Sequence, residues 1–250
     1  MKIDFQQVYN LLRKEPIVTY KMLYQLFHAP LEPRLQLWYQ EGAVMVLGSH
    51  SLQMYGEEAV LEGFLAQLER GREYSFFGVP YKLLPLLNRY FDGIENEESC
   101  TAYTILATDF SGGPDPALGS LTLADAEFVD EHWTYKFEGS VDYFRHFIAT
   151  YPSSALRVNG KLVGWSVCYD AIEDMVNLGS LRVLEEYRQQ GLGRKLALDL
   201  VGKVLATGKT PMVHIMDDNI ASRTLSMGIG FTPYSEKLFW GRGKKKYNIS

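Results

Sequence analysis

Two glycines and a set of cations form the part of the sequence best suited to chemistry. Residues 188–195 read Arg-Gln-Gln-Gly-Leu-Gly-Arg-Lys, between a strand-like run and a helix-like run. The first N–H groups of a helix point outward without partners, and the helix dipole adds partial positive charge there. Because Gly191 and Gly193 let the backbone approach an anion closely, the pattern predicts a phosphate-binding loop, with Arg188, Arg194 and Lys195 adding charge.

Two other phosphate-binding loops do not fit this segment. A P-loop needs Gly, four residues and then Gly-Lys-Ser/Thr, which the sequence lacks. The dinucleotide fingerprint needs a third glycine at position 196, where leucine stands. The loop is therefore of another kind.

The hydrophobic pattern predicts the elements that position this loop. Leucine or valine recurs every fourth residue from Leu192 to Val204, which indicates a helix, and Asn159-Gly160 between two β-prone runs predicts a hairpin. Thr122 and Asp125 have the spacing of a capping box. Strands are expected at 118–121, 155–158, 161–169, 175–183, 211–216 and 234–240, and helices at 123–133, 140–148, 188–206 and 221–227.

A Gly- and Pro-rich stretch at 109–116 reads as a linker, because neither helix nor strand persists there. It suggests two domains, 1–110 and 111–250. The first half also reads as α/β but carries no chemical motif. The fold class expected is α/β, a mixed sheet covered on both faces. Helices are expected at 8–12, 20–27, 57–70 and 81–91, and strands at 35–39, 44–47, 74–78 and 101–108.

Composition excludes several classes of protein. The 250 residues are 46% hydrophobic with net charge −5, which argues against disorder and against a nucleic-acid-binding protein. The basic run 242–246 is interpreted as a solvated tail. Cys100 and Cys168 are expected as buried thiols, too few for a disulfide framework or a zinc site, so no metal is expected. No apolar run reaches 18 residues and no signal peptide is recognisable, which predicts no membrane association and a cytoplasmic location.

The loop Arg188-Gln-Gln-Gly-Leu-Gly193 resembles the pyrophosphate-binding motif of the GNAT superfamily of acyl-CoA-dependent N-acyltransferases. The segment 219–225 and Gly230-Phe231 resemble the superfamily's Asn-containing helix. The segments 123–133, 151–152, 164–165, 184–191 and 214–219 are similar to the glycine N-acyltransferase-like branch. The resemblance implies a GNAT fold in 111–250, preceded by a degenerate, GNAT-like N-terminal α/β domain.

The resemblance also implies how acetyl-CoA or another acyl-CoA binds as substrate. The strand end at 181–183 would pair with the pantetheine arm and polarise the thioester carbonyl, and 188–195 would hold the pyrophosphate. Asn219 and Ser222 would contact the arm from the other side. The cofactor-binding set is thus Leu181, Arg182, Val183, Arg188, Gln189, Gln190, Gly191, Leu192, Gly193, Arg194, Lys195, Asn219 and Ser222.

The proton-transfer residues depart from the superfamily's pattern. Asn177 stands where relatives often have a glutamate base, and Ser226 where they often have a tyrosine acid. His214 is the replacement base that we favour, because an unperturbed imidazole titrates near neutral pH and the resemblance retains histidine there. A core role for His214 stays open, as do functional roles for Glu173, Asp174 and His132.

The function expected is N-acyl transfer from acyl-CoA to a primary amine, such as an amino acid or another small molecule. With Asn177 and Ser226 in the proton-transfer positions, the alternative is a catalytically silent acyl-CoA sensor or interaction module. The expected partner is a small-molecule amine acceptor, not nucleic acid or a membrane, and a homodimer is compatible with the sequence.

Overall fold

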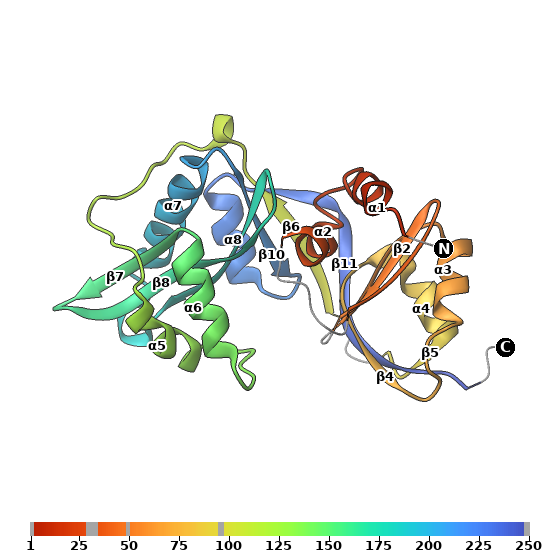
Figure 1. The fold of residues 1–250 in the computed structure, drawn as a ribbon. Helices are drawn as coiled ribbons and strands as arrows, with labels where there is room; N and C mark the ends of the chain where they lie inside the picture. Colours follow the sequence, from red (N-terminus) through yellow and green to blue (C-terminus); the bar gives the residue numbers. More distant parts are fainter. Residues whose placement is uncertain (1–2, 29–34, 49–50, 95–97, 248–250) are drawn as a thin grey trace. The chain divides into compact units, whose positions relative to one another are not determined.

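The computed structural model describes residues 3–28, 35–48, 51–94 and 98–247, which form a mixed α/β structure (Figure 1). These residues divide into two compact units. Unit 1 contains the chain up to Ala102, the segment Ile215–Asn219 and the chain from Pro233 onward. Unit 2 contains Tyr103–His214 and Ile220–Thr232. The last strand, which lies in the second half of the sequence, thus belongs mainly to the first unit.

The strands of unit 1 form a mixed sheet in the order β1-β2-β3-β4-β11-β6, and β5 pairs with β11. β1, β2 and β3 make an antiparallel meander, whereas β4 runs parallel to β3 and antiparallel to β11. The bounds are β1 Gln36–Gln40, β2 Ala43–Leu47, β3 Leu52–Gly56, β4 Glu73–Pro80, β5 Phe91–Asp92, β6 Glu98–Thr104 and β11 Thr232–Lys245.

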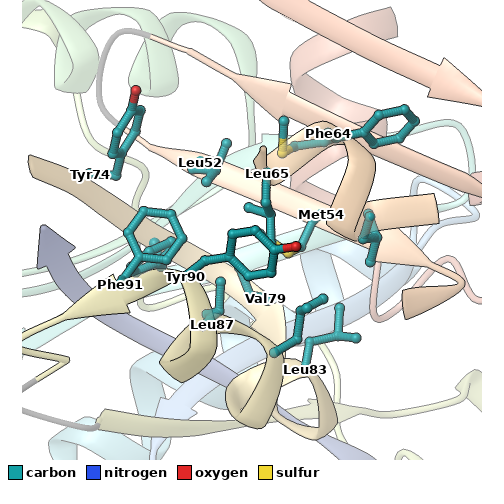
Figure 2. Close-up of a cluster of buried hydrophobic side chains, with 14 of the residues drawn as sticks. Leu52, Met54, Phe64, Leu65, Tyr74, Val79, Leu83, Leu87, Tyr90 and Phe91 are labelled. Atoms are coloured by element: carbon teal, nitrogen blue, oxygen red, sulfur yellow. The ribbon is translucent and has the colours of Figure 1, made fainter. Parts of the chain in front are cut away.

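The core of unit 1 lies between this sheet and two helices, α3 (Glu58–Leu65) and α4 (Leu84–Tyr90) (Figure 2). The helix α2 (Tyr20–Phe27) has the predicted bounds, whereas α1 (Phe5–Leu12) begins three residues before the predicted 8–12, because the Asp4 carboxylate caps it there. The helix expected at 57–70 ends at Leu65, because the N–H groups of Gln67 and Leu68 bond to carbonyls three residues back, in place of the helical four.

Asp217 ties the segment 215–219 to unit 1. Its carboxylate accepts from Ser99 Oγ at 2.6 Å and Thr101 Oγ1 at 2.7 Å on β6, and from Lys237 Nζ at 2.6 Å on β11. Partial burial raises the pKa of Asp217, but Lys237 and the two hydroxyls outweigh it and hold that pKa below its usual value. The segment is therefore anchored by an ionised side chain.

Unit 2 has four strands in the order β10-β9-β8-β7, with β9 and β10 parallel and the other pairs antiparallel. The predicted hairpin is confirmed, since Asn159 (φ 51°) and Gly160 (φ 79°) form its turn. The bounds are β7 Ser153–Val158, β8 Lys161–Ala171, β9 Met175–Val183 and β10 Thr210–Met216, with helices α5 Ala126–Glu131, α6 Ser140–Thr150, α7 Leu192–Leu205 and α8 Ile220–Gly228.

Helices cover both faces of the unit 2 sheet, as predicted. α5 and α6 pack on the face that carries Trp165 and Val167, and Phe144 and Phe147 of α6 lie in the same core. α7 packs on the other face, where Leu196 lies so near Gly164 that a Cβ there would stand 2.9 Å from it. Within the described residues, no helix is both long and apolar enough to span a bilayer.

Three expectations about local structure are corrected. The segment 118–121 is not a strand, because only Gly119 bridges to Ala155 and the N–H of Leu121 donates to Ser153 Oγ instead. The capping box is present, but it opens a short 3₁₀ turn and the helix ends at Glu131. The basic run 242–246 is not a solvated tail: β11 continues through Lys245, which is buried.

Candidate functional site

The glycine loop leads directly from β9 into α7. After a 3₁₀ turn at Glu185–Tyr187, Gly191 adopts left-handed backbone angles (φ 74°) and caps α7 without a side-chain hydrogen bond. A Cβ built on Gly191 or Gly193 would meet no described atom within 4 Å. Open space therefore adjoins the uncapped N–H groups of a helix start, which is the arrangement that a phosphate needs.

The parallel strands β9 and β10 separate just before this loop. Their pairing runs from Thr210 with Met175 to Val213 with Leu178 and goes no further. β9 nevertheless continues to Val183 and β10 to Met216. The stretch 181–183, predicted to pair with a pantetheine arm, thus lies where β9 is not paired to β10.

A β-bulge distorts β9 at the same place. Between the pairs Val167–Gly179 and Trp165–Arg182, β9 has one residue more than β8, and Ser180 has a positive φ of 43°. Such bulges re-aim backbone groups and often lie beside functional sites. On β8, Tyr169 is the extra residue of a second bulge. Burial raises its pKa to about 12 although hydrogen bonds with Ser180 and Trp133 lower it, so the hydroxyl is protonated at neutral pH.

The cations of the loop are engaged within the chain. Arg188 Nε donates to the Val183 carbonyl at 3.0 Å, which closes the loop on the end of β9. Arg194 donates to the carbonyl of Gly228 at 3.2 Å, and Lys195 Nζ lies 3.2 Å from Asp115 Oδ2. Gln189 and Gln190, which follow Arg188, are exposed.

Beside the start of α7 lies a cavity of about 290 Å³. Arg194 and Leu198 of α7 form one wall, and Asp109 and Ser111 of the linker form another. The end of α8, from Met227 onward, completes the lining. The glycine loop therefore has room for a polar group next to it.

The predicted linker packs on α7. No helix or strand forms over 110–115, as expected. However, the buried Asp199 carboxylate accepts the N–H of Asp115 at 2.8 Å and pairs with Lys203 at 2.7 Å. A Cβ on Gly202 would stand 2.7 Å from the linker backbone. Nothing in the local sequence of α7 signals these contacts.

Of the three residues predicted for catalysis, two lie in contact and the third lies on another element. His214 and Asn177 come together, with Nδ1 of the imidazole 3.3 Å from Oδ1 of the amide. Ser226 is buried on α8, where its carbonyl accepts the N–H of Phe231 at 3.0 Å and closes the helix end. Ser222 lies near the start of α8, whereas Asn219 belongs to unit 1.

The His132 side chain, at the C-terminal end of α5, makes contacts within the core of unit 2. Its Nδ1 lies 2.8 Å from the Phe128 carbonyl, and its ring packs edge-to-face on Trp165. Its own carbonyl accepts from Arg182 at 2.6 Å. His132 thus links α5 to the end of β9 that is not paired to β10, and the Arg182 side chain has a packing role that the sequence does not indicate.

Comparison with known proteins gives two kinds of match. The FR47-like protein family model matches residues 157–240, about a third of the chain, including the glycine loop and both separating strands. A solved Drosophila protein is 18% identical, with a TM-score of 0.74 over 99% of each chain. A GNAT-family acetyltransferase from Colwellia psychrerythraea is 14% identical, with a TM-score of 0.60 over 95% of this chain and 97% of that one.

A tandem GNAT protein from the clavulanic acid biosynthesis pathway is also similar, at 14% identity and a TM-score of 0.57. The match covers 96% of this chain and 95% of the tandem GNAT protein. The chain has the GNAT fold. The predicted fold class is thereby confirmed. The Colwellia and clavulanic acid pathway proteins are named as GNAT proteins. The glycine N-acyltransferase-like branch stays a prediction.

Proposed function

We propose that the protein is an N-acyltransferase that moves an acetyl or other acyl group from acyl-CoA to a primary amine. One observation carries the proposal. The pairing of β9 with β10 stops at Leu178 and Val213, directly before an open glycine loop at a helix start. A thioester-bearing chain with a pyrophosphate at its far end has the shape and charge to use both features.

The residues of unit 2 fit such a donor, which supplies an activated acyl thioester when bound. N–H groups of the first turn of α7, with Arg188 and Arg194 nearby, would hold the pyrophosphate. Backbone groups at 181–183 would pair with the pantetheine arm and donate toward the acyl carbonyl. The bulge at Ser180 supports this role, because it takes backbone groups out of the regular ladder.

His214 is the base in this proposal. An amine must be neutral to attack a thioester, and an imidazole accepts a proton near neutral pH. His214 lies on β10 just beyond the last pair with β9, at the point where the strands separate. The role of Ser226 as proton donor finds no support in its buried place at the end of α8.

We infer further that residues 1–110 are a degenerate GNAT-like half and residues 111–250 the acyl-CoA-binding half, with β11 of the second half completing the unit 1 sheet. The similarity to a tandem GNAT protein over nearly the whole chain supports this division. All the predicted donor-binding residues except Asn219 lie in unit 2. The acceptor class, a small amine such as an amino acid, follows from the narrower resemblance of the sequence.

The donor site is tested with a glycine substitution that the fold tolerates. Gly193→Ala adds a methyl group into open space within α7, so the fold should persist while the anion loses close approach. Gly63→Ala is the matched control, since Gly63 is also helical with open space around it. We expect calorimetry to show at least tenfold weaker CoA binding for Gly193→Ala only. Equal CoA affinities in both variants would rule out the glycine loop as the pyrophosphate site.

Turnover is tested by thiol release with acetyl-CoA and longer acyl-CoAs against amino acids and polyamines. His214→Gln keeps size and hydrogen bonding but loses basicity, so we expect a rate loss of about 10²–10⁴-fold with CoA affinity little changed. A near-normal rate would exclude His214 as the base. CoA binding without turnover for any amine would favour a silent sensor instead.

A further inference from the structure

A row of polar side chains crosses three strands of unit 2. The strand register pairs Asp170 of β8 with Asn177 of β9, and Asn177 with Met212 of β10. Directly paired residues place their side chains on the same face, and His214, two residues after Met212, returns to that face. Asp170 and Asn177 are 5% and 3% exposed. Val167 and Gly179 also pair on this face, which α5 and α6 cover.

The contact between Asn177 and His214 determines where the imidazole proton lies. Nδ1 of His214 is 3.3 Å from Oδ1 of Asn177. An amide oxygen only accepts hydrogen bonds, so a neutral His214 must carry its proton on Nδ1. The lone pair is then on Nε2, the nitrogen that can take a proton from an amine.

The strand register places Asp170 where it can select the end of the Asn177 amide that faces the histidine. An asparagine amide can turn by half a rotation with little change in shape, and its NH₂ group would then donate to Nδ1 and reverse the tautomer. A carboxylate only accepts, so Asp170, directly across from Asn177, favours the NH₂ group on its own side. The amide oxygen is thereby directed toward β10.

We propose that Asn177 is a positioning residue that holds His214 in the tautomer with a basic Nε2, and that Asp170 orients Asn177. The assignment of an amine as the group that Nε2 deprotonates rests on the proposed function. The assignment of the tautomer does not. The proposal also accounts for an amide at a position where the resemblance leads one to expect a glutamate base. Asn177 acts through the histidine and takes no proton itself. The Tyr169 hydroxyl, on the same side, is protonated at neutral pH and adds no charge.

The tautomer is measured by ¹⁵N NMR of the histidine-labelled full chain without CoA, and His214→Gln assigns the signals. We expect the signature of a protonated Nδ1 and a bare Nε2. Asn177→Leu and the isosteric Asp170→Asn should each shift the signals toward the other tautomer. Met212→Leu, a volume-conserving change on the same face, should leave them unchanged.

A protonated Nε2 in the wild type, or unchanged His214 signals in folded Asn177→Leu and Asp170→Asn, would overturn the proposal. In the kinetic arm, Asn177→Leu should lower kcat by about 10²-fold, with KM for acyl-CoA little changed. If no amine is acylated but the tautomer shifts as expected, the proposed function fails and the positioning role stands. If acylation occurs but the tautomer is wrong, only the positioning role fails.

Discussion

The ring of Tyr169 occupies the space that a side chain at Gly179 would need. A Cβ built on Gly179 would lie 1.9 Å from a ring carbon of Tyr169, far inside van der Waals contact. Tyr169 is the extra residue of the β8 bulge, and Gly179 immediately precedes the bulge residue Ser180 on β9. The glycine therefore allows an aromatic ring to lie against the strand beside the proposed donor site.

We predict that Gly179→Ala destabilises the fold by about 1–3 kcal/mol, because the ring must move out of a packed position. Tyr169→Leu should reduce this cost, since the smaller side chain leaves room for the methyl group. Urea unfolding of both single variants and the double variant measures the coupling between the two positions. Strictly additive free energies of unfolding would show that the ring is not what Gly179 accommodates.

Local patterns predicted the parts of the fold that depend on neighbouring residues. The Asn159-Gly160 hairpin, α7 and the glycine loop follow from turn chemistry and helical spacing, and each is present. Partnerships between distant residues could not be predicted this way. Asp199 binds the N–H of Asp115, 84 residues away, and Asp217 binds Thr101, 116 residues away.

The same distinction applies to the candidate site. The loop glycines are visible in the sequence because their chemistry is local. The contact of His214 with Asn177 depends on the register of two parallel strands, which residue spacing does not give. The prediction of a solvated tail near Lys245 is wrong for the same reason, since the pairing of this segment with β4 and β5 is nonlocal.

Asp115 competes for a cation of the glycine loop. The N–H of Ala117 and the ammonium of Lys195 hold the pKa of Asp115 below its usual value, so the carboxylate is charged at neutral pH. We predict that Asp115→Asn releases Lys195 and tightens CoA binding by up to about fivefold, an effect that high salt removes. Asp142→Asn is the control, because Asp142 pairs with Arg145 on the surface of α6. Equal calorimetric affinities for the two variants would contradict the competition.

Asp199 holds the linker against α7, so its removal should expose the linker. The Asp199 side chain is fully buried and pairs with Lys203, so we predict that Asp199→Ala lowers the free energy of unfolding by about 3–5 kcal/mol. The segment 110–115 has no regular structure to protect it once released. Limited proteolysis should therefore cleave the segment 110–115 faster in Asp199→Ala than in the wild type. An unchanged cleavage pattern would mean that other contacts hold the linker.

Lys245 is a buried ammonium without a carboxylate partner among the described residues. It is 1% exposed, and its Nζ lies 4.7 Å from the Tyr90 ring centre and 5.9 Å from that of Phe91. Burial, and then the charge of Arg70, lower its pKa below the usual 10.5. Between that lowered pKa and 10.5 the unfolded chain binds more protons than the folded chain, so stability rises with pH there. Below the lowered pKa the full cost of burying the charge is present.

We predict that Lys245→Met stabilises the protein at pH 7 on the order of 1 kcal/mol, because methionine fills the site without a charge and the relieved desolvation exceeds the lost cation–π contact. The gain should shrink as pH rises from the lowered pKa toward 10.5, since the wild-type lysine then becomes neutral in the folded state and the cost of burying its charge disappears. Lys244→Met is the control, because Lys244 is the exposed neighbour on the same strand. Urea unfolding at pH 7, 8.5 and 10 measures both variants. A loss of stability at pH 7 would show that the aromatic contacts fully compensate the buried charge, and a gain independent of pH would show that the charge is not its source.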